Sequence, residues 1–142
     1  MIPVKICGIT REEDARLATR LGAAALGFIF YPLSPRYIAP GRAKDIADTV
    51  GRRIRKVGVF VNSLPEKINA IVDEVGLDLV QISGDEPPEV CRGVTVPVIK
   101  TFHVGPISTR PPHSPTTSMP SCWIPTRRAA TAAPAGPLNG PW

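Results

Sequence analysis

The chain has 142 residues, a usual length for one domain, and 43% of them are hydrophobic, which is enough to form a buried core. No apolar run is long enough to cross a bilayer, and residues 1–3 lack the basic-then-apolar pattern of a signal peptide, so we expect a cytoplasmic protein without a membrane partner. Three cysteines, an odd number with no CxxC pair, argue against a disulfide framework and against a zinc site.

The net charge of +5 is unevenly distributed along the chain. The last acidic residue is Glu89, whereas three arginines follow Val104. Scattered arginines without interleaved aromatic residues are a weak indication of nucleic-acid binding, so we expect no nucleic-acid partner. A basic binding module that uses its C-terminal segment remains the third of three interpretations.

Strand-like and helix-like segments alternate from Pro3 to Phe102. Thr10 to Glu13 and Ser63 to Glu66 both match the capping-box pattern, which predicts a helix start at each. Gly22 and Gly76 are predicted to end these two helices. Strands are predicted over 4–7, 25–30, 57–61, 79–82 and 97–102, and helices over 10–21, 43–50 and 65–75, with a short one near residue 89.

Strict alternation of helices with continuously apolar strands indicates a parallel sheet covered by helices. The candidates are a TIM barrel and an open doubly wound sheet. Neither GxGxxG nor GxxxxGK[ST] follows the first strand, which excludes the main nucleotide-binding versions of the open sheet.

The alternation disappears after residue 104. Nine prolines occur in residues 105–142, with no helical stripe and no strand-like run. Such a segment cannot bury enough apolar surface to offset the entropy of ordering it. We therefore predict two parts, a strand–helix domain over 1–104 and a disordered Pro/Ala-rich tail over 105–142.

A cysteine ends the first predicted strand. Alternate strand residues share a face, so Lys5 and Cys7 lie on the same side of the sheet. In a barrel, Cys7 would stand at the C-terminal rim, where barrel active sites lie. From these residues alone, a small buried hydrophobe, a redox centre and an acid–base group all remain open, the first being the commonest.

Four motifs, in this order and spacing, resemble phosphoribosylanthranilate isomerase, an enzyme family of tryptophan biosynthesis. The resemblance covers residues 2 to about 103, and the motifs together are specific where any one would be only suggestive. They are "KICGITREEDA" (5–15), "FIFYPLSPRYI" (28–38), "KVGVFVN" (56–62) and "DLVQISGDE" (78–86).

The resemblance implies a (β/α)8 barrel and an Amadori rearrangement of N-(5'-phosphoribosyl)anthranilate to 1-(2-carboxyphenylamino)-1-deoxyribulose 5-phosphate, without metal or cofactor. Cys7 matches the general base that removes a proton from C2' of the ribose. Arg36 matches the arginine that holds the anthranilate carboxylate, for which a planar guanidinium is well shaped. Lys5 is a candidate source of the positive charge that favours a thiolate, or else a structural lysine. The partner is a small phosphorylated substrate, and a complete barrel is expected to be a monomer or a homodimer.

The sequence departs from the family pattern in two ways. Ser83 stands where the family usually has histidine, from which we expect a modest effect. Only five of eight strands are predicted, so this is an incomplete barrel. The aspartate that acts as general acid at the end of strand six, a glycine-rich loop and the phosphate site after strands seven and eight are missing from the sequence.

The genetic code suggests that the tail is read out of frame from near Gly105. We shift the reading frame back by one base, so that each codon begins with the last base of the preceding codon. Because the single codons of Met119 and Trp123 both end in G, Pro120 must then become alanine and Ile124 must become aspartate. "MPSCWIP" then permits "DAFLLDT", and residues 131–139 permit "YGGTGRTFE", two motifs of the family in the right order. A real frameshift and a sequencing error fit equally well. The chain with this shift reversed is called the frame-restored protein below.

Two other interpretations of the chain rank above the basic binding module. The first is a phosphoribosylanthranilate isomerase whose chain is incomplete. The second is a non-catalytic truncated barrel that lacks the general acid and the phosphate site. Catalytic activity in the purified protein would distinguish between them.

Overall fold

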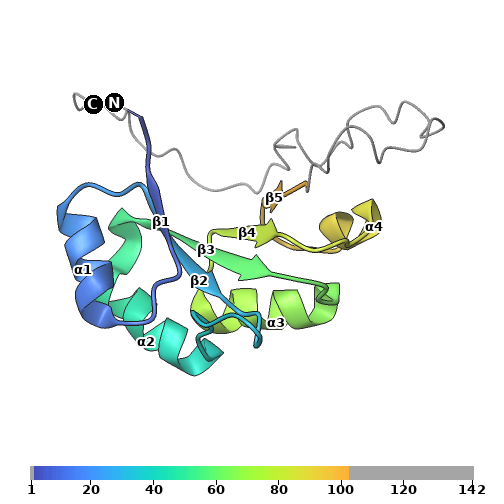
Figure 1. The fold of residues 1–142 in the computed structure, drawn as a ribbon, viewed down its shortest axis with the longest axis horizontal. Coiled ribbons are helices and arrows are strands. Elements are labelled where there is room, and N and C mark those ends of the chain that lie inside the picture. Colours follow the sequence, from blue (N-terminus) through green and yellow to red (C-terminus); the bar gives the residue numbers. More distant parts are fainter. Residues whose placement is uncertain (1, 103–142) are drawn as a thin grey trace, which may run out of the picture.

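A computed structural model describes residues 2–102 of the protein (Figure 1). The predicted tail over 105–142 lies outside the described residues. The elements follow one another as β1 (Lys5–Cys7), α1 (Glu12–Arg20), β2 (Ala25–Ile29), α2 (Pro40–Val50), a 3-10 turn (Gly51–Arg53), β3 (Arg55–Phe60), α3 (Pro65–Val75), β4 (Leu79–Ile82), α4 (Pro88–Arg92) and β5 (Val98–Lys100).

The five strands form one parallel sheet in the order β1-β2-β3-β4-β5. Helices α1, α2 and α3 lie on the same side of this sheet (Figure 1). A doubly wound sheet has helices on both faces and reverses its strand order at a switch point, whereas sequential strands with helices on one side are typical of a barrel. The structure thus selects the barrel-type alternative.

The hydrophobic core lies between the sheet and its helices. Alternate strand residues point into it, such as Leu26 and Phe28 of β2 and Val80 and Ile82 of β4. The opposite face therefore carries the residues between them, including Lys5, Cys7 and Gln81. This confirms that Lys5 and Cys7 share the face of the sheet that becomes the interior of a barrel.

Neither of the two predicted capping boxes forms. Helix α1 begins after Arg11 and α3 after Leu64, and neither N-cap residue makes a side-chain capping bond. Proline at the first position of α3 has no N–H to cap and a backbone angle that already suits a helix. The first turn of α1 carries three acidic residues, whose charge stabilises the exposed N–H groups without a cap.

The predicted glycine stops are confirmed. Gly76 takes the left-handed conformation, with φ at 70°, and its N–H donates to the Val72 carbonyl at 2.9 Å. Gly22, with φ at 80°, follows the end of α1. No helix in the described part of the chain is long and apolar enough to span a membrane.

Candidate active site

The Cys7 thiol stands at the C-terminal end of β1, beside a glycine of the neighbouring strand. Cys7 pairs with Gly27 of β2 in the parallel register. A Cβ atom at Gly27 would lie 2.7 Å from the Cys7 Sγ, closer than real contacts allow. The missing side chain at Gly27 therefore gives the thiol its place on the interior face of the sheet.

Gly8 turns the chain away from the sheet directly after Cys7. Its φ of 87° is in the left-handed region that favours glycine. The N–H groups of Gly8 and Ile9 both donate to the Gly27 carbonyl, at 2.9 and 3.0 Å. Ile9 is buried in the core, so both ends of this turn are fixed and Cys7 is held at the rim.

The structure brings Arg36 to Cys7, although 29 residues separate them. Arg36 lies in the loop between β2 and α2, and its Nη1 donates to the Cys7 carbonyl at 3.2 Å. A Cβ at Gly8 would lie 2.7 Å from the Arg36 Cδ, so the arginine side chain packs directly on the glycine backbone. The loop is tied to the sheet by the Ile38 N–H, which donates to the Ile29 carbonyl at 3.0 Å.

This geometry places a half-buried thiol and an exposed guanidinium at the C-terminal rim of the sheet. A guanidinium can bind a carboxylate through two parallel hydrogen bonds. A thiolate can accept a proton from a substrate held beside it. The structure thus brings the two residues predicted from the sequence together, through the contact of the Arg36 guanidinium with the Cys7 carbonyl.

Lys5 is part of a polar network across the interior face of the sheet. Its Nζ donates to the Gln81 Oε1 of β4. The Gln81 Nε2 in turn donates to the Ser83 Oγ at 3.1 Å and the Thr101 Oγ1 at 3.3 Å. Sequence reasoning identified Lys5 and Ser83 but missed Gln81 and Thr101, whose place on the interior face follows from strand alternation.

A buried ion pair joins the loops at the same rim, and sequence reasoning missed it. Glu86 and Lys100 lie 2.9 Å apart, with side chains only 3% and 9% exposed. The Asn62 N–H also donates to Glu86, at 2.5 Å, and Lys100 donates to the Gly84 carbonyl at 2.6 Å. The loops after β3 and β4 are therefore fixed to the end of β5.

The charge state of Glu86 follows from these contacts. Burial by itself raises the pKa of Glu86, but hydrogen bonds from Lys100 and from backbone N–H groups, together with the charge of Lys100, outweigh it and lower the pKa below its usual value of 4.5. A lowered pKa in the folded state stabilises the fold at pH values above the unfolded pKa. That contribution is lost as the pH falls through the folded pKa.

We expect Glu86→Gln in the frame-restored protein to lower the free energy of unfolding by about 3–5 kcal/mol at pH 7, because it leaves Lys100 buried without a counter-charge. The matched control is Glu89→Gln, since Glu89 forms an exposed pair with Arg92, and there we expect a change within about 1 kcal/mol. Urea unfolding measures both. The gap between wild type and Glu86→Gln should shrink below about pH 4, and a gap that is constant down to pH 3 would contradict this account.

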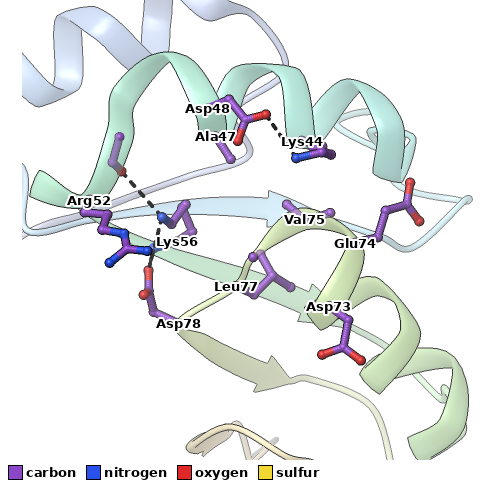
Figure 2. A pocket seen from close by; sticks show the side chains of 12 residues that line it. Lys44, Ala47, Asp48, Arg52, Lys56, Asp73, Glu74, Val75, Leu77 and Asp78 are labelled. Atoms are coloured by element: carbon purple, nitrogen blue, oxygen red, sulfur yellow. Dashed lines mark hydrogen bonds and ion pairs between the residues drawn. The ribbon is translucent and has the colours of Figure 1, made fainter. Parts of the chain in front are cut away.

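A separate cavity of about 700 Å³ opens at the opposite end of the strands, between the C-terminal ends of α2 and α3 (Figure 2). Four of the seven charged side chains that line it form two ion pairs: Lys56 lies 3.8 Å from Asp78 and also donates to the Gly51 carbonyl at 3.4 Å, and Lys44 lies 3.0 Å from Asp48. In barrels this N-terminal face contributes to stability, whereas active sites lie at the other face. The cavity contains none of the predicted site residues.

The chain matches a known protein family over most of its length. The family model described as N-(5'-phosphoribosyl)anthranilate (PRA) isomerase matches residues 4–113. The chain belongs to this family. It is 48% identical to the N-(5'-phosphoribosyl)anthranilate isomerase of Geobacter sulfurreducens over 112 residues, which cover 79% of this chain and 55% of that protein. The corresponding protein of Syntrophus aciditrophicus is 48% identical over 99 residues, 70% of this chain and 43% of that protein.

Solved PRA isomerase structures confirm the fold. The Thermus thermophilus protein superposes with a TM-score of 0.71 at 47% identity, covering 72% of this chain and 52% of that chain. The Thermotoga maritima protein gives a TM-score of 0.69 at 48% identity, covering 70% and 50%. The five-strand sheet is therefore an incomplete barrel of the PRA isomerase type. The chain spans about half the length of the curated relatives that it matches.

Proposed function

We propose that the chain is the N-terminal part of an enzyme that converts N-(5'-phosphoribosyl)anthranilate to 1-(2-carboxyphenylamino)-1-deoxyribulose 5-phosphate by an Amadori rearrangement in tryptophan biosynthesis. The enzyme works in the cytoplasm, on a small phosphorylated substrate, without cofactor or metal. Support comes from the family match and from a related PRA isomerase, 48% identical, solved with reduced 1-(o-carboxyphenylamino)-1-deoxyribulose 5-phosphate.

The observation that carries this proposal is the contact of Arg36 with the backbone of Cys7 and Gly8. Arg36 holds the anthranilate carboxylate at the rim. This fixes the ribose beside the Cys7 thiolate, which removes the proton from C2' while the C1'–N bond is an iminium. The electron pair of the broken C–H bond forms the enolamine, which becomes the ketone product. Lys5 supplies positive charge on the same face as the thiolate.

The proton donor to the ribose ring oxygen and the phosphate site belong to the second half of the barrel. The 142-residue chain therefore carries the base and the carboxylate site but does not turn over substrate by itself. Residues 1–104 are the part of the barrel that contains strands one to five, and 105–142 is the out-of-frame reading of the remainder. The completed enzyme is a monomer or a homodimer; a dimeric form is named for the Thermotoga maritima relative.

Arg36→Ala in the frame-restored protein is expected to raise the KM about 10- to 100-fold, with a smaller change in kcat. The reason is that Arg36 binds the substrate carboxylate but accepts no proton. Arg36→Lys should restore only part of the affinity, because an ammonium lacks the planar fork. The measurement is the loss of anthranilate-type fluorescence at varied substrate concentration.

Arg92→Ala is the matched control, since Arg92 is an exposed arginine paired with Glu89 on α4. It should leave the KM unchanged. A KM for Arg36→Ala that equals that of the control would show that Arg36 does not bind the carboxylate.

A further inference from the structure

Gln81 lies at the centre of the polar network on the interior face of the sheet, and its contacts fix the orientation of its amide. The Lys5 ammonium donates to the Gln81 Oε1, while the Gln81 Nε2 donates to the Ser83 Oγ at 3.1 Å and the Thr101 Oγ1 at 3.3 Å. A flipped amide would turn its NH2 group toward the ammonium, and two donors cannot form a hydrogen bond with each other. The Gln81 oxygen is therefore held in front of Lys5.

This contact keeps the Lys5 side chain over the interior face. Lys5 is the first residue of β1, and its flexible four-carbon chain could otherwise extend into solvent. The Nζ instead reaches β4, although Lys5 and Gln81 are 76 residues apart in the chain. Cys7 lies on the same face of β1, two residues farther on, so its Cα is about 7 Å from that of Lys5.

The partner of Lys5 differs from the partners of other lysines because it is neutral. Lys44, Lys56 and Lys100 all pair with carboxylates. Within residues 2–102, no carboxylate forms an ion pair with Lys5. An amide accepts a hydrogen bond from the ammonium without cancelling its charge, so Lys5 can still attract a neighbouring anion.

We propose that Gln81 is a positioning residue, which holds the Lys5 ammonium uncancelled on the face where its charge stabilises the Cys7 thiolate. Gln81 acts through Lys5 in this role. The coupling of the three residues follows from the contacts and from their shared face of the sheet. Its effect on catalysis rests on the proposed function, in which Cys7 is the base.

The test is the rate at which iodoacetamide alkylates Cys7 in the 142-residue chain, followed by mass spectrometry of the peptide that contains Cys7. Iodoacetamide is uncharged and reacts with the thiolate, so the rate reports how much thiolate is present. Gln81→Met is similar in size but lacks the amide oxygen that binds Lys5. It should lower the rate at pH 7.5 about threefold or more, the effect of one charge at about 7 Å in water. Lys5→Met should lower the rate by at least as much.

Gln81→Glu distinguishes this role from a purely structural one. A carboxylate still accepts from Lys5, and the Ser83 and Thr101 hydroxyls can donate to its other oxygen, so the network is kept. Because the carboxylate cancels the charge of Lys5, the alkylation rate should stay as low as in Gln81→Met. The matched control for the loss of a lysine is Lys67→Met, at an exposed position of α3, which should keep the wild-type rate.

The pH profile shows whether the variants act through charge. The Arg36 guanidinium, which donates to the Cys7 carbonyl, stays in every variant, and β2 faces the thiol with Gly27, which has no titratable side chain. At about pH 10 an ordinary thiol is ionised without a neighbouring charge. All variants should then be alkylated at the wild-type rate, and circular dichroism at both pH values establishes that they fold.

The outcomes separate the role of Gln81 from the activity. A wild-type rate in Gln81→Met at pH 7.5, recovery of the rate in Gln81→Glu, or differences that persist at pH 10 would overturn the proposal. In the frame-restored protein, Gln81→Met should lower kcat about threefold or more with little change in KM. The expected alkylation rates together with an inactive frame-restored wild type would uphold the coupling of Gln81, Lys5 and Cys7 and contradict the proposed function.

Discussion

Cys7→Ser in the frame-restored protein is expected to lower kcat by about 100- to 10,000-fold, the contribution usual for a positioned acid–base group. A serine hydroxyl is nearly the same size as the thiol but a far poorer proton acceptor than a thiolate. The space that Gly27 leaves beside Cys7 accommodates serine equally well. The KM should change little, because the proposed function assigns substrate binding to Arg36 and to the phosphate site.

Cys91→Ala is the matched control for this substitution. Cys91 is buried among the core residues at α4, away from the interior face of the sheet, and its loss should cost some stability without lowering kcat. Circular dichroism of both variants establishes that they fold. An unchanged kcat in Cys7→Ser would assign Cys7 to the hydrophobic packing of the strand end.

Shifting the reading frame by one base near Gly105 is expected to give a chain above roughly 200 residues, the lower end for this barrel. The new segment should be an apolar strand that ends in an aspartate, followed by a glycine-rich loop. Closing the barrel pairs the edges of β1 and β5, each of which has one strand partner in the described residues. We therefore expect the restored protein to be more soluble than the 142-residue chain, because unpaired strand edges favour aggregation.

Sequencing the gene through residue 105 and expressing both frames tests this expectation. Stop codons soon after the shift, or no aspartate after an apolar strand, would contradict it. In that case the alanine and aspartate forced from residues 119–124 are a coincidence, and the tail belongs to the protein as written.

The strands could be predicted from the sequence because each is a short apolar run between turn residues. The run 79–82 matches β4 completely, whereas β3 begins at Arg55, two residues before its apolar run. The polar first residues of β3 are fixed by a hydrogen bond outside the core, in which the Lys56 N–H donates to the Asp78 carboxylate at 2.7 Å. Hydrophobic pattern alone does not detect a strand residue fixed in this way.

The site was only partly predictable. Strand alternation placed Lys5 and Cys7 on one face of the sheet. The approach of Arg36 to Cys7 depends on the path of a proline-rich loop, which the residues alone do not predict. The family resemblance suggested the role of Arg36. Glu86 and Lys100 were missed for a related reason. They come from a loop and from a strand 14 residues apart, and a charged residue normally indicates a solvated position unless its partner is known.

The central claim is that Cys7 and Arg36 form half of an isomerase site that the rest of the barrel completes. The direct test is a fluorescence assay of N-(5'-phosphoribosyl)anthranilate conversion, with the 142-residue chain and the frame-restored protein at equal concentration. The account predicts turnover by the frame-restored protein and none above background by the short chain. Turnover by the short chain at a comparable rate, or none by a folded frame-restored protein, would contradict it.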